Sequence, residues 1–306
     1  MPQFSFPHCY TGYNSSTREE VATKLRDATI AITTALPITA SDLDSCPKLE
    51  CIMAMSTGVD WVDKDEFRKR GVTVINAPQI SVSSVSEHAI ALYFAARRKI
   101  VDLHDRIIDT DEYKEKRTLR HHFPEPPRTC SLETLVIFGN GHLGKRVAEI
   151  GRALGMKVLI SERKGAPSSP REGRVSFDDC LRQGTVFIVT VPRNDSTLDM
   201  ISDKEFKLMR KDAILINVAR GGIVNEKAVA SALKEGRLNA AAIDVYETEP
   251  PERGVSALLD ATIPNLILSP HIAWFSAESI QNLQNAILKG ISSYVAGKPI
   301  NAVVRV

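Results

Sequence analysis

Short apolar runs alternate with amphipathic stretches along the first part of the chain. The runs at residues 29–32, 50–55 and 72–75 predict buried strands. Residues 18–27, before the first run, and 63–70, before the last, predict helices. Strands that alternate with helices in this way are typical of a parallel sheet.

A second alternating series begins near residue 134. A long helical stretch, from about Ser83 to Ile108, and a polar, proline-rich loop at residues 121–128 precede it. Its strands are predicted at residues 135–138, 157–160, 186–191, 213–218, 240–243 and 266–268. Six strands with helices between them favour a doubly wound sheet. A last helix is predicted from about Ala277 to Ala296, because Gly297 and Pro299 follow it.

A chain of 306 residues is long enough for two domains, and the two series predict one open α/β sheet in each. In such sheets ligands bind beyond the carboxyl ends of the strands. We therefore expect a ligand site in a cleft between the two predicted domains.

One strand of the second series ends in a Gly-x-Gly-x-x-Gly turn, formed by Gly139, Gly141 and Gly144, and a helical pattern follows. This arrangement presents backbone N–H groups and the positive end of a helix to a pyrophosphate. Glu162 follows the next strand, 23 residues after Gly139, near the spacing of the acid that binds an adenosine ribose. The alternative is a glycine turn with only a structural role. The order of strand, turn, helix, strand and acid favours a dinucleotide site.

Polar side chains follow three later strands of this series. Arg220 precedes two glycines, Asp244 and Glu249 lie after the next strand, and His271 follows the last one. An arginine can clamp a carboxylate, and a histidine beside a carboxylate can exchange a proton with a carbonyl oxygen. Each residue alone is also consistent with a surface or structural role, which is the common role for single acids and histidines. Together they predict hydride-transfer chemistry on a small anionic substrate, with Asp244 placed to bind a nicotinamide carboxamide.

Composition narrows the class of protein further. Hydrophobic residues make up 43% and charged residues 25%, and the net charge of +2 gives no reason to expect nucleic acid as a partner. The five cysteines form no Cys-x-x-Cys pair, so we expect neither a disulfide framework nor a metal site. Neither a membrane-spanning apolar run nor a signal-peptide pattern is evident, and we expect a cytoplasmic protein.

The motifs resemble those of the D-isomer-specific 2-hydroxyacid dehydrogenase family. The similar segments are residues 139–144, 217–226, 244–251 and 269–274, together with 56–60 and 85–88. Within the family, residues 156–164 and 271–274 look most like those of glycerate dehydrogenases, which are hydroxypyruvate reductases.

The resemblance implies NAD(P)-dependent interconversion of 2-oxo acids and (R)-2-hydroxy acids, with hydroxypyruvate or glyoxylate as expected substrates. It implies that His271 is the acid/base, that Glu249 is its partner, and that Arg220 clamps the substrate. Backbone N–H groups of Thr57 and Gly58 would bind the substrate carboxylate.

The resemblance also implies an organisation and a set of cofactor contacts. Residues 1–98 and 273–306 would form a flavodoxin-like substrate domain, residues 99–272 would form an NAD(P)-binding Rossmann domain, and two copies would pair through the latter. The expected cofactor-binding residues are Gly139, Gly141, His142, Leu143, Gly144, Glu162, Arg163, Val191, Pro192, Thr197, Val218, Ala219, Asp244 and Ala273.

The choice of cofactor depends on the residues around Glu162. A carboxylate there accepts hydrogen bonds from a ribose diol and repels a 2′-phosphate, which favours NAD. Arg163 and Lys164 follow directly and could pair with that phosphate, so NADP stays open.

A second hypothesis is an NAD(H)-sensing, corepressor-like binding protein on the same fold, with little turnover. The same motifs would be present in such a protein. Turnover with a panel of 2-oxo acids distinguishes the two hypotheses.

Overall fold

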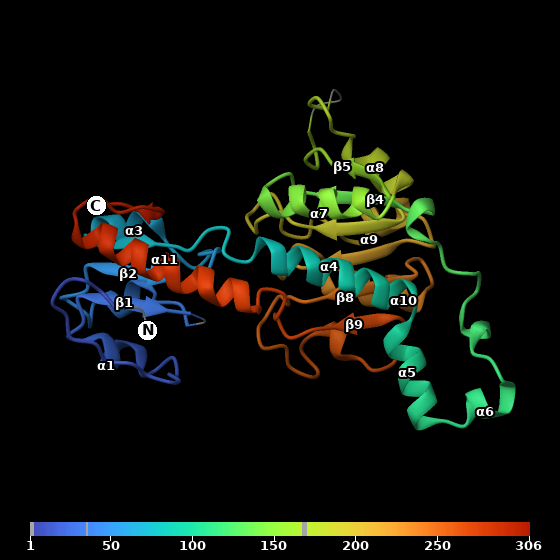
Figure 1. Ribbon diagram of the computed structural model, residues 1–306, viewed down its shortest axis with the longest axis horizontal. Helices are drawn as coiled ribbons and strands as arrows, with labels where there is room; N and C mark the ends of the chain where they lie inside the picture. The colour runs from blue at the N-terminus through green and yellow to red at the C-terminus, as the bar shows by residue number, and fades with distance from the viewer. Residues whose placement is uncertain (1–2, 35, 167–169) are drawn as a thin grey trace. The chain divides into compact units, whose positions relative to one another are not determined.

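The computed structural model describes residues 3–34, 36–166 and 170–306. It divides into two compact units (Figure 1). The first unit comprises Met1–Ser81 and Phe275–Val306, and the second comprises Val82–Trp274. Each unit is built on its own sheet, as the alternating pattern predicts.

The sheet of the first unit has four strands in the order β1-β2-β3-β10. Strands β1 (Ile30–Thr33), β2 (Cys51–Ala54) and β3 (Thr73–Ile75) are parallel, which confirms the three predicted strands. Strand β10 (Ala302–Val304) was not predicted, and it pairs antiparallel with β3. The sheet is therefore mixed, because the chain returns after the last helix and adds an edge strand of three residues.

Helices cover both faces of this sheet. Residues of α1 (Val21–Leu25), α2 (Ala40–Leu43) and α3 (Lys64–Lys69) pack into one apolar cluster on one face. Helix α11 (Ala277–Val295) packs on the other face, close to the predicted bounds. The sequence pattern missed α2, which has only four residues and begins at a capping box of Thr39 and Asp42.

The sheet of the second unit has six parallel strands in the order β5-β4-β6-β7-β8-β9. The strands are β4 (Thr134–Phe138), β5 (Lys157–Ile160), β6 (Val186–Val189), β7 (Ile214–Asn217), β8 (Ala240–Ile243) and β9 (Leu266–Leu268). An isolated parallel bridge between Ser161 and Val175 extends the sheet beyond β5. These strands confirm the predicted doubly wound sheet, and their carboxyl ends all lie at one edge.

Two helical layers bury this sheet. Helices α4 (Val82–Arg97) and α7 (His142–Ala153) pack on one face, where Figure 1 shows them side by side. Helices α8 (Phe177–Gln183), α9 (Asp203–Leu208) and α10 (Glu226–Lys234) pack on the other face. Both layers hold the strands rigidly, so the loops after the strands start from defined positions.

The helical stretch predicted from Ser83 to Ile108 is two helices rather than one. Helix α4 ends at Arg97, Lys99 adopts a left-handed conformation with φ of 49°, and α5 (Ile100–Asp109) follows. The left-handed residue turns the chain, so α5 leaves the sheet. Helix α6 (Glu112–Lys116) and three 3-10 turns, η1 (Arg120–His122), η2 (Cys130–Leu132) and η3 (Ala257–Leu259), complete the described elements.

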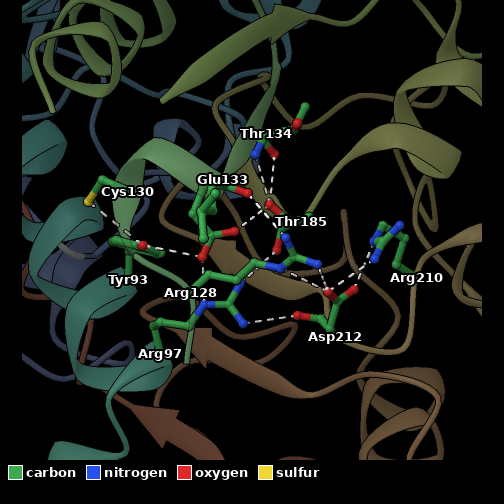
Figure 2. Close-up of polar contacts among 10 residues, drawn as sticks. Tyr93, Arg97, Arg128, Cys130, Glu133, Thr134, Thr185, Arg210 and Asp212 are labelled. Carbon is green, nitrogen blue, oxygen red and sulfur yellow. Dashed lines mark hydrogen bonds and ion pairs between the residues drawn. The ribbon is translucent and has the colours of Figure 1, made fainter. Parts of the chain in front are cut away.

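The boundary between the units differs from the predicted one at residues 82–98 and 273–274. The prediction assigned both segments to the substrate domain, whereas Val82–Trp274 forms the second unit. Figure 2 shows the reason at the end of α4: the buried Arg97 pairs with the buried Glu133, with Nε and Oε1 2.7 Å apart. Arg97 Nη1 also donates to the carbonyl oxygen of Asp212 at 3.0 Å. A buried ion pair of this kind ties the helix to the six-stranded sheet.

Candidate active site

The glycine-rich turn lies between β4 and α7, at the carboxyl edge of the six-stranded sheet. Gly139 has a φ of 115°, and a Cβ at Gly144 would lie 2.2 Å from the carbonyl oxygen of Gly139. A Cβ built on Gly141 would meet no atom within 4 Å. The first glycine thus allows the turn, the third allows the helix to pack on it, and the second leaves the backbone open to a ligand. These features fit the pyrophosphate of a dinucleotide at the N-terminus of α7, where His142 and Leu143 begin the helix.

Glu162 follows β5 and the Ser161 bridge at the same edge of the sheet. Its side chain is buried, and its carboxylate pairs with Arg171, which also donates from Nε to Oε2 at 2.8 Å. The backbone N–H of Arg163 donates to Oε1 at 2.8 Å. The hydrogen bond from the Arg171 guanidinium is the main reason that the pKa of Glu162 is strongly lowered. The position matches the predicted ribose site, but the acid already has a cationic partner.

The loop after β7 carries Arg220. The buried Asn217 accepts from the N–H of Ala219 at 3.1 Å and donates to the carbonyl of Arg220 at 2.9 Å, which holds the turn. Gly221 comes next, and a Cβ there would lie only 1.7 Å from the carbonyl oxygen of Tyr246. The turn at Arg220 therefore packs backbone to backbone against the loop after β8.

The loops after β8 and β9 bring Glu249 and His271 together. His271 Nδ1 lies 2.6 Å from Glu249 Oε2, and the N–H of Tyr246 donates to Glu249 Oε1 at 2.9 Å. Burial opposes ionisation of Glu249, but the contacts with His271 and Tyr246 and the charge of Arg220 outweigh it and lower its pKa. The predicted acid, base partner and cation thus meet at one edge of the sheet. His271 has a φ of 51°, an uncommon conformation that functional residues often adopt.

Asp244 is completely buried and anchors the loop that carries His271. It accepts hydrogen bonds from Ser269 Oγ at 2.5 Å and from the N–H groups of Ile272 and Ala273, each at 3.0 Å. Burial alone would raise the pKa of Asp244, but contacts with His88, Ser269 and these N–H groups together lower it. The structure thus gives Asp244 a positioning role, in addition to the nicotinamide contact that the sequence predicts.

The remaining predicted cofactor residues also lie after strands of the six-stranded sheet. They are Val191, Pro192 and Thr197 after β6, Val218 and Ala219 after β7, and Ala273 after β9. The Thr197 hydroxyl donates to the carbonyl of Pro192 at 2.8 Å and so closes its own loop. All of them share the edge of the sheet at which the glycine turn lies, and their contacts with a cofactor stay predictions.

The predicted carboxylate-binding residues belong to the first unit. Thr57 and Gly58 follow β2, and the turn is held by Asn76, which donates from Nδ2 to the carbonyl of Thr57 at 2.7 Å. Ser56 Oγ donates to the carbonyl of Gly58, also at 2.7 Å. Both residues thus sit on a hydrogen-bonded turn at the carboxyl end of a strand.

Three supporting residues were not predicted. Asn217 holds the Arg220 turn, and Glu226 at the start of α10 accepts from the N–H of Glu247 at 2.8 Å. His88 of α4 contacts Ser269 Oγ at 3.1 Å beside Asp244. Asn217 could have been found from the sequence, because it is a polar residue at the end of a predicted buried strand. Glu226 and His88 could not, because the residues that they contact lie far away in the sequence.

One group of side chains in the described part of the chain has metal-ligand character. Donor atoms of Glu112, His121 and His122 lie within 4.8 Å of one another. Lys116 Nζ also contacts Glu112 Oε1 at 2.9 Å, and Arg106 Nη1 lies 3.5 Å from Oε2. These cations already pair with the Glu112 carboxylate. The three side chains are therefore explained as part of an ion-pair cluster that links α5, α6 and η1.

The comparisons with known proteins point to one family. The family model described as "D-isomer specific 2-hydroxyacid dehydrogenase, NAD binding domain" matches residues 90–273. A glycerate dehydrogenase of Methylorubrum extorquens is 39% identical over 302 residues, which cover 98% of this chain and 94% of the relative. A glyoxylate reductase of Aeropyrum pernix is 32% identical, with 96% of this chain and 88% of the relative covered.

Two solved structures resemble the chain over nearly its full length. A D-lactate dehydrogenase of Aquifex aeolicus, complexed with NAD and lactic acid, has a TM-score of 0.74 and 27% identity, over 90% of this chain and 85% of the other. An acyclic imino acid reductase complexed with NADPH and D-Arg has a TM-score of 0.78 and 28% identity, over 96% of this chain and 91% of the other.

The fold and the site define an oxidoreductase that binds a nicotinamide dinucleotide. The chain belongs to the D-isomer-specific 2-hydroxyacid dehydrogenase family. Among the described residues, every helix is too short or too polar to cross a lipid bilayer.

Proposed function

We propose that the chain reduces a small 2-oxo acid to the (R)-2-hydroxy acid, with hydroxypyruvate and glyoxylate as the first candidate substrates. The observation that carries this proposal is the His271–Glu249 pair, with 2.6 Å between Nδ1 and Oε2, at the edge of the sheet that also carries the glycine turn. The names of the relatives, glycerate dehydrogenase and glyoxylate reductase, support these two substrates.

The roles of the side chains follow from their donor and acceptor atoms. A bound reduced nicotinamide supplies the hydride. Because a carboxylate only accepts hydrogen bonds, His271 keeps a proton on Nδ1 toward Glu249, and Nε2 holds the proton that the substrate carbonyl oxygen receives. In the reverse direction Nε2 accepts that proton. Glu249 orients the ring through its contact with Nδ1.

Arg220 and the turn of the first unit are proposed to bind the substrate. The planar guanidinium of Arg220 suits a carboxylate and the adjacent carbonyl oxygen. Thr57 and Gly58 lie on a hydrogen-bonded turn, where backbone N–H groups can bind a carboxylate. Substitution of Arg220 therefore raises KM and lowers kcat together, because the same side chain holds substrate and polarises its carbonyl.

We propose NADH as a hydride donor, because Glu162 lies where an acid binds the adenosine ribose. We also propose a homodimer formed through the second unit. No residue of α5 is buried within the chain, and Ile100, Ile107 and Ile108 are 54%, 54% and 68% exposed. An apolar helix face of this kind is typical of a protein–protein interface. A cytoplasmic location stays a prediction from the sequence.

The test of the proposed function is turnover of a panel of 2-oxo acids by the pure protein with NADH or NADPH. We expect loss of the reduced nicotinamide absorbance with hydroxypyruvate or glyoxylate, and (R)-configured products. Cofactor binding without turnover on any member of the panel would contradict the proposal and favour the NAD(H)-sensing hypothesis.

A further inference from the structure

The end of β5 carries more positive charge than the predicted ribose site requires. Residues 161–174 contain four cations and two acids, and Glu162 is the one acid of the two that lies buried against the sheet extension. Its backbone N–H donates to the carbonyl of Val175 at 2.8 Å, so its position is defined by the sheet.

The carboxylate of Glu162 has its acceptor sites filled within the chain. Oε1 accepts from the N–H of Arg163 at 2.8 Å and from Arg171 Nη2. Oε2 accepts from Arg171 Nε at 2.8 Å and from the Arg171 N–H at 3.2 Å. A carboxylate offers about four lone-pair sites. A ribose diol that donates to Glu162 must therefore compete with the Arg171 guanidinium.

The other cations of this segment are placed differently. Lys164 Nζ pairs with Glu205 Oε1 at 2.8 Å and donates to the carbonyl of Met200 at 2.9 Å, so it is directed away from the acid. Arg174 is 3.8 Å from Glu162 Oε1, and its side chain is only 18% exposed. The Arg171 side chain is 53% exposed and covers a carboxylate that is 5% exposed. Arg171 is thus the cation that lies between Glu162 and the solvent, and a ligand must displace it to contact the carboxylate.

We propose that Arg171 is the residue that recognises the 2′ position of the dinucleotide, and that the Glu162–Arg171 pair lets the chain bind both NAD and NADP. While paired, Arg171 neutralises the acid that would repel a 2′-phosphate. Rotated outward, its planar fork binds that phosphate with two parallel hydrogen bonds, and the exposed Arg163 adds a second cation. With NAD, the ribose diol takes the acceptor sites that Arg171 leaves. The inference rests on the proposed dinucleotide site at the glycine turn.

The test compares two ligands that differ only in the 2′-phosphate, AMP and adenosine 2′,5′-bisphosphate, by calorimetric titration of the full chain. In the unsubstituted protein we expect the bisphosphate to bind at least as tightly as AMP. Arg171→Ala should weaken the bisphosphate by about tenfold or more, because charge-assisted hydrogen bonds are lost. AMP affinity should stay the same or rise, because the Glu162 carboxylate becomes available.

Three further variants separate the role of Arg171 from a general effect on charge or folding. Glu162→Gln keeps the shape of the side chain and should lower the affinity for AMP relative to the bisphosphate. Arg171→Lys keeps the charge without the fork, and should retain part of the preference. Arg182→Ala removes an arginine whose side chain is also 53% exposed, in α8, and should change neither affinity.

Two outcomes overturn the proposal, and they can be told apart. If both nucleotides bind and Arg171→Ala leaves the ratio of their affinities unchanged, Arg171 does not read the 2′ position, whereas the dinucleotide site stands. If the unsubstituted protein binds neither nucleotide, the proposed dinucleotide site fails as well. The ratio of kcat/KM for NADPH and NADH, measured in the same variants, should follow the ratio of the binding constants.

Discussion

Asp244→Asn should destabilise the second unit and impair the loop that carries His271. The carboxylate of Asp244 accepts from Ser269 Oγ and from the N–H groups of Ile272 and Ala273. An asparagine of the same shape has one oxygen and one NH₂ group. Either orientation turns that NH₂ toward a backbone N–H or a hydroxyl donor, so one buried donor loses its partner.

The magnitude follows from these contacts. A hydrogen bond to a charged group contributes about 1.5–3 kcal/mol, and a buried donor without a partner costs about 1–3 kcal/mol. Since the side chain is completely buried, solvent cannot replace the lost contact. We expect a loss of about 2–4 kcal/mol in the free energy of unfolding, which corresponds to about 4–16 °C in Tm for a unit of this size.

The effect of pH has a defined sign. The pKa of Asp244 is lowered in the folded state, so its ionised contacts stabilise the fold above the unfolded-state pKa of about 3.9. That stabilisation is lost as the pH falls through the folded-state pKa. The difference in stability between the unsubstituted protein and Asp244→Asn should therefore be complete at pH 7 and should narrow below pH about 4.

The assay is thermal and urea unfolding followed by circular dichroism across this range of pH. Asp178→Asn is the matched control. The Asp178 side chain is 61% exposed, and its ion pair with Arg182 is long at 3.8 Å, so the contact is weak. It should change stability by less than about 0.5 kcal/mol. Two results would refute the reasoning about Asp244. One is equal stability of Asp244→Asn and the unsubstituted protein at pH 7. The other is a difference in the free energy of unfolding that stays constant as the pH changes.

Three other predictions concern separate parts of the chain. Gly221→Ala should lower kcat about 100-fold while cofactor binding is retained. The added Cβ would lie 1.7 Å from the Tyr246 carbonyl oxygen and must displace the Arg220 turn. A near-normal kcat would contradict this prediction. If the proposed dimer forms through α5, light scattering should find a dimer for the unsubstituted protein and a monomer for Ile108→Arg, because Ile108 is 68% exposed on that helix. A dimer that Ile108→Arg leaves unchanged would contradict an interface at α5. Arg97→Met should cost about 3–5 kcal/mol in urea unfolding by leaving Glu133 buried without its partner, and adding Glu133→Gln should recover part of that loss; an additive double variant would count against the pair.

The sequence predicted the long elements of both sheets better than the short ones. Short apolar runs that alternate with helical patterns located nine strands to within a few residues, because buried parallel strands need such runs. Strand β10 and helix α2 escaped prediction, since three or four residues carry too little periodicity. The break at Lys99 escaped as well, because the pattern of apolar residues continues through it and the left-handed residue is not glycine.

The site was predictable where residues follow strands, and less so where loops pair with each other. Arg220, Glu249 and His271 each lie in the loop that follows a strand of one sheet, so parallel topology predicts that they lie at one edge. Glu162 pairs with Arg171, nine residues further along the chain and outside any regular element, and no hydrophobic periodicity predicts such a pair. The partner of Lys164 was not predictable either. The sequence suggested that Lys164 could pair with a 2′-phosphate, whereas in the structure it pairs with Glu205.

The most direct measurement of the central claim is the rate of reduced nicotinamide consumption by His271→Ala at saturating cofactor and hydroxypyruvate or glyoxylate. Loss of a positioned acid should lower kcat by about 10²–10⁴-fold, and the affinity for the cofactor, titrated separately, should be nearly unchanged. A kcat within a few-fold of the unsubstituted protein would contradict the assignment of proton transfer to the His271–Glu249 pair.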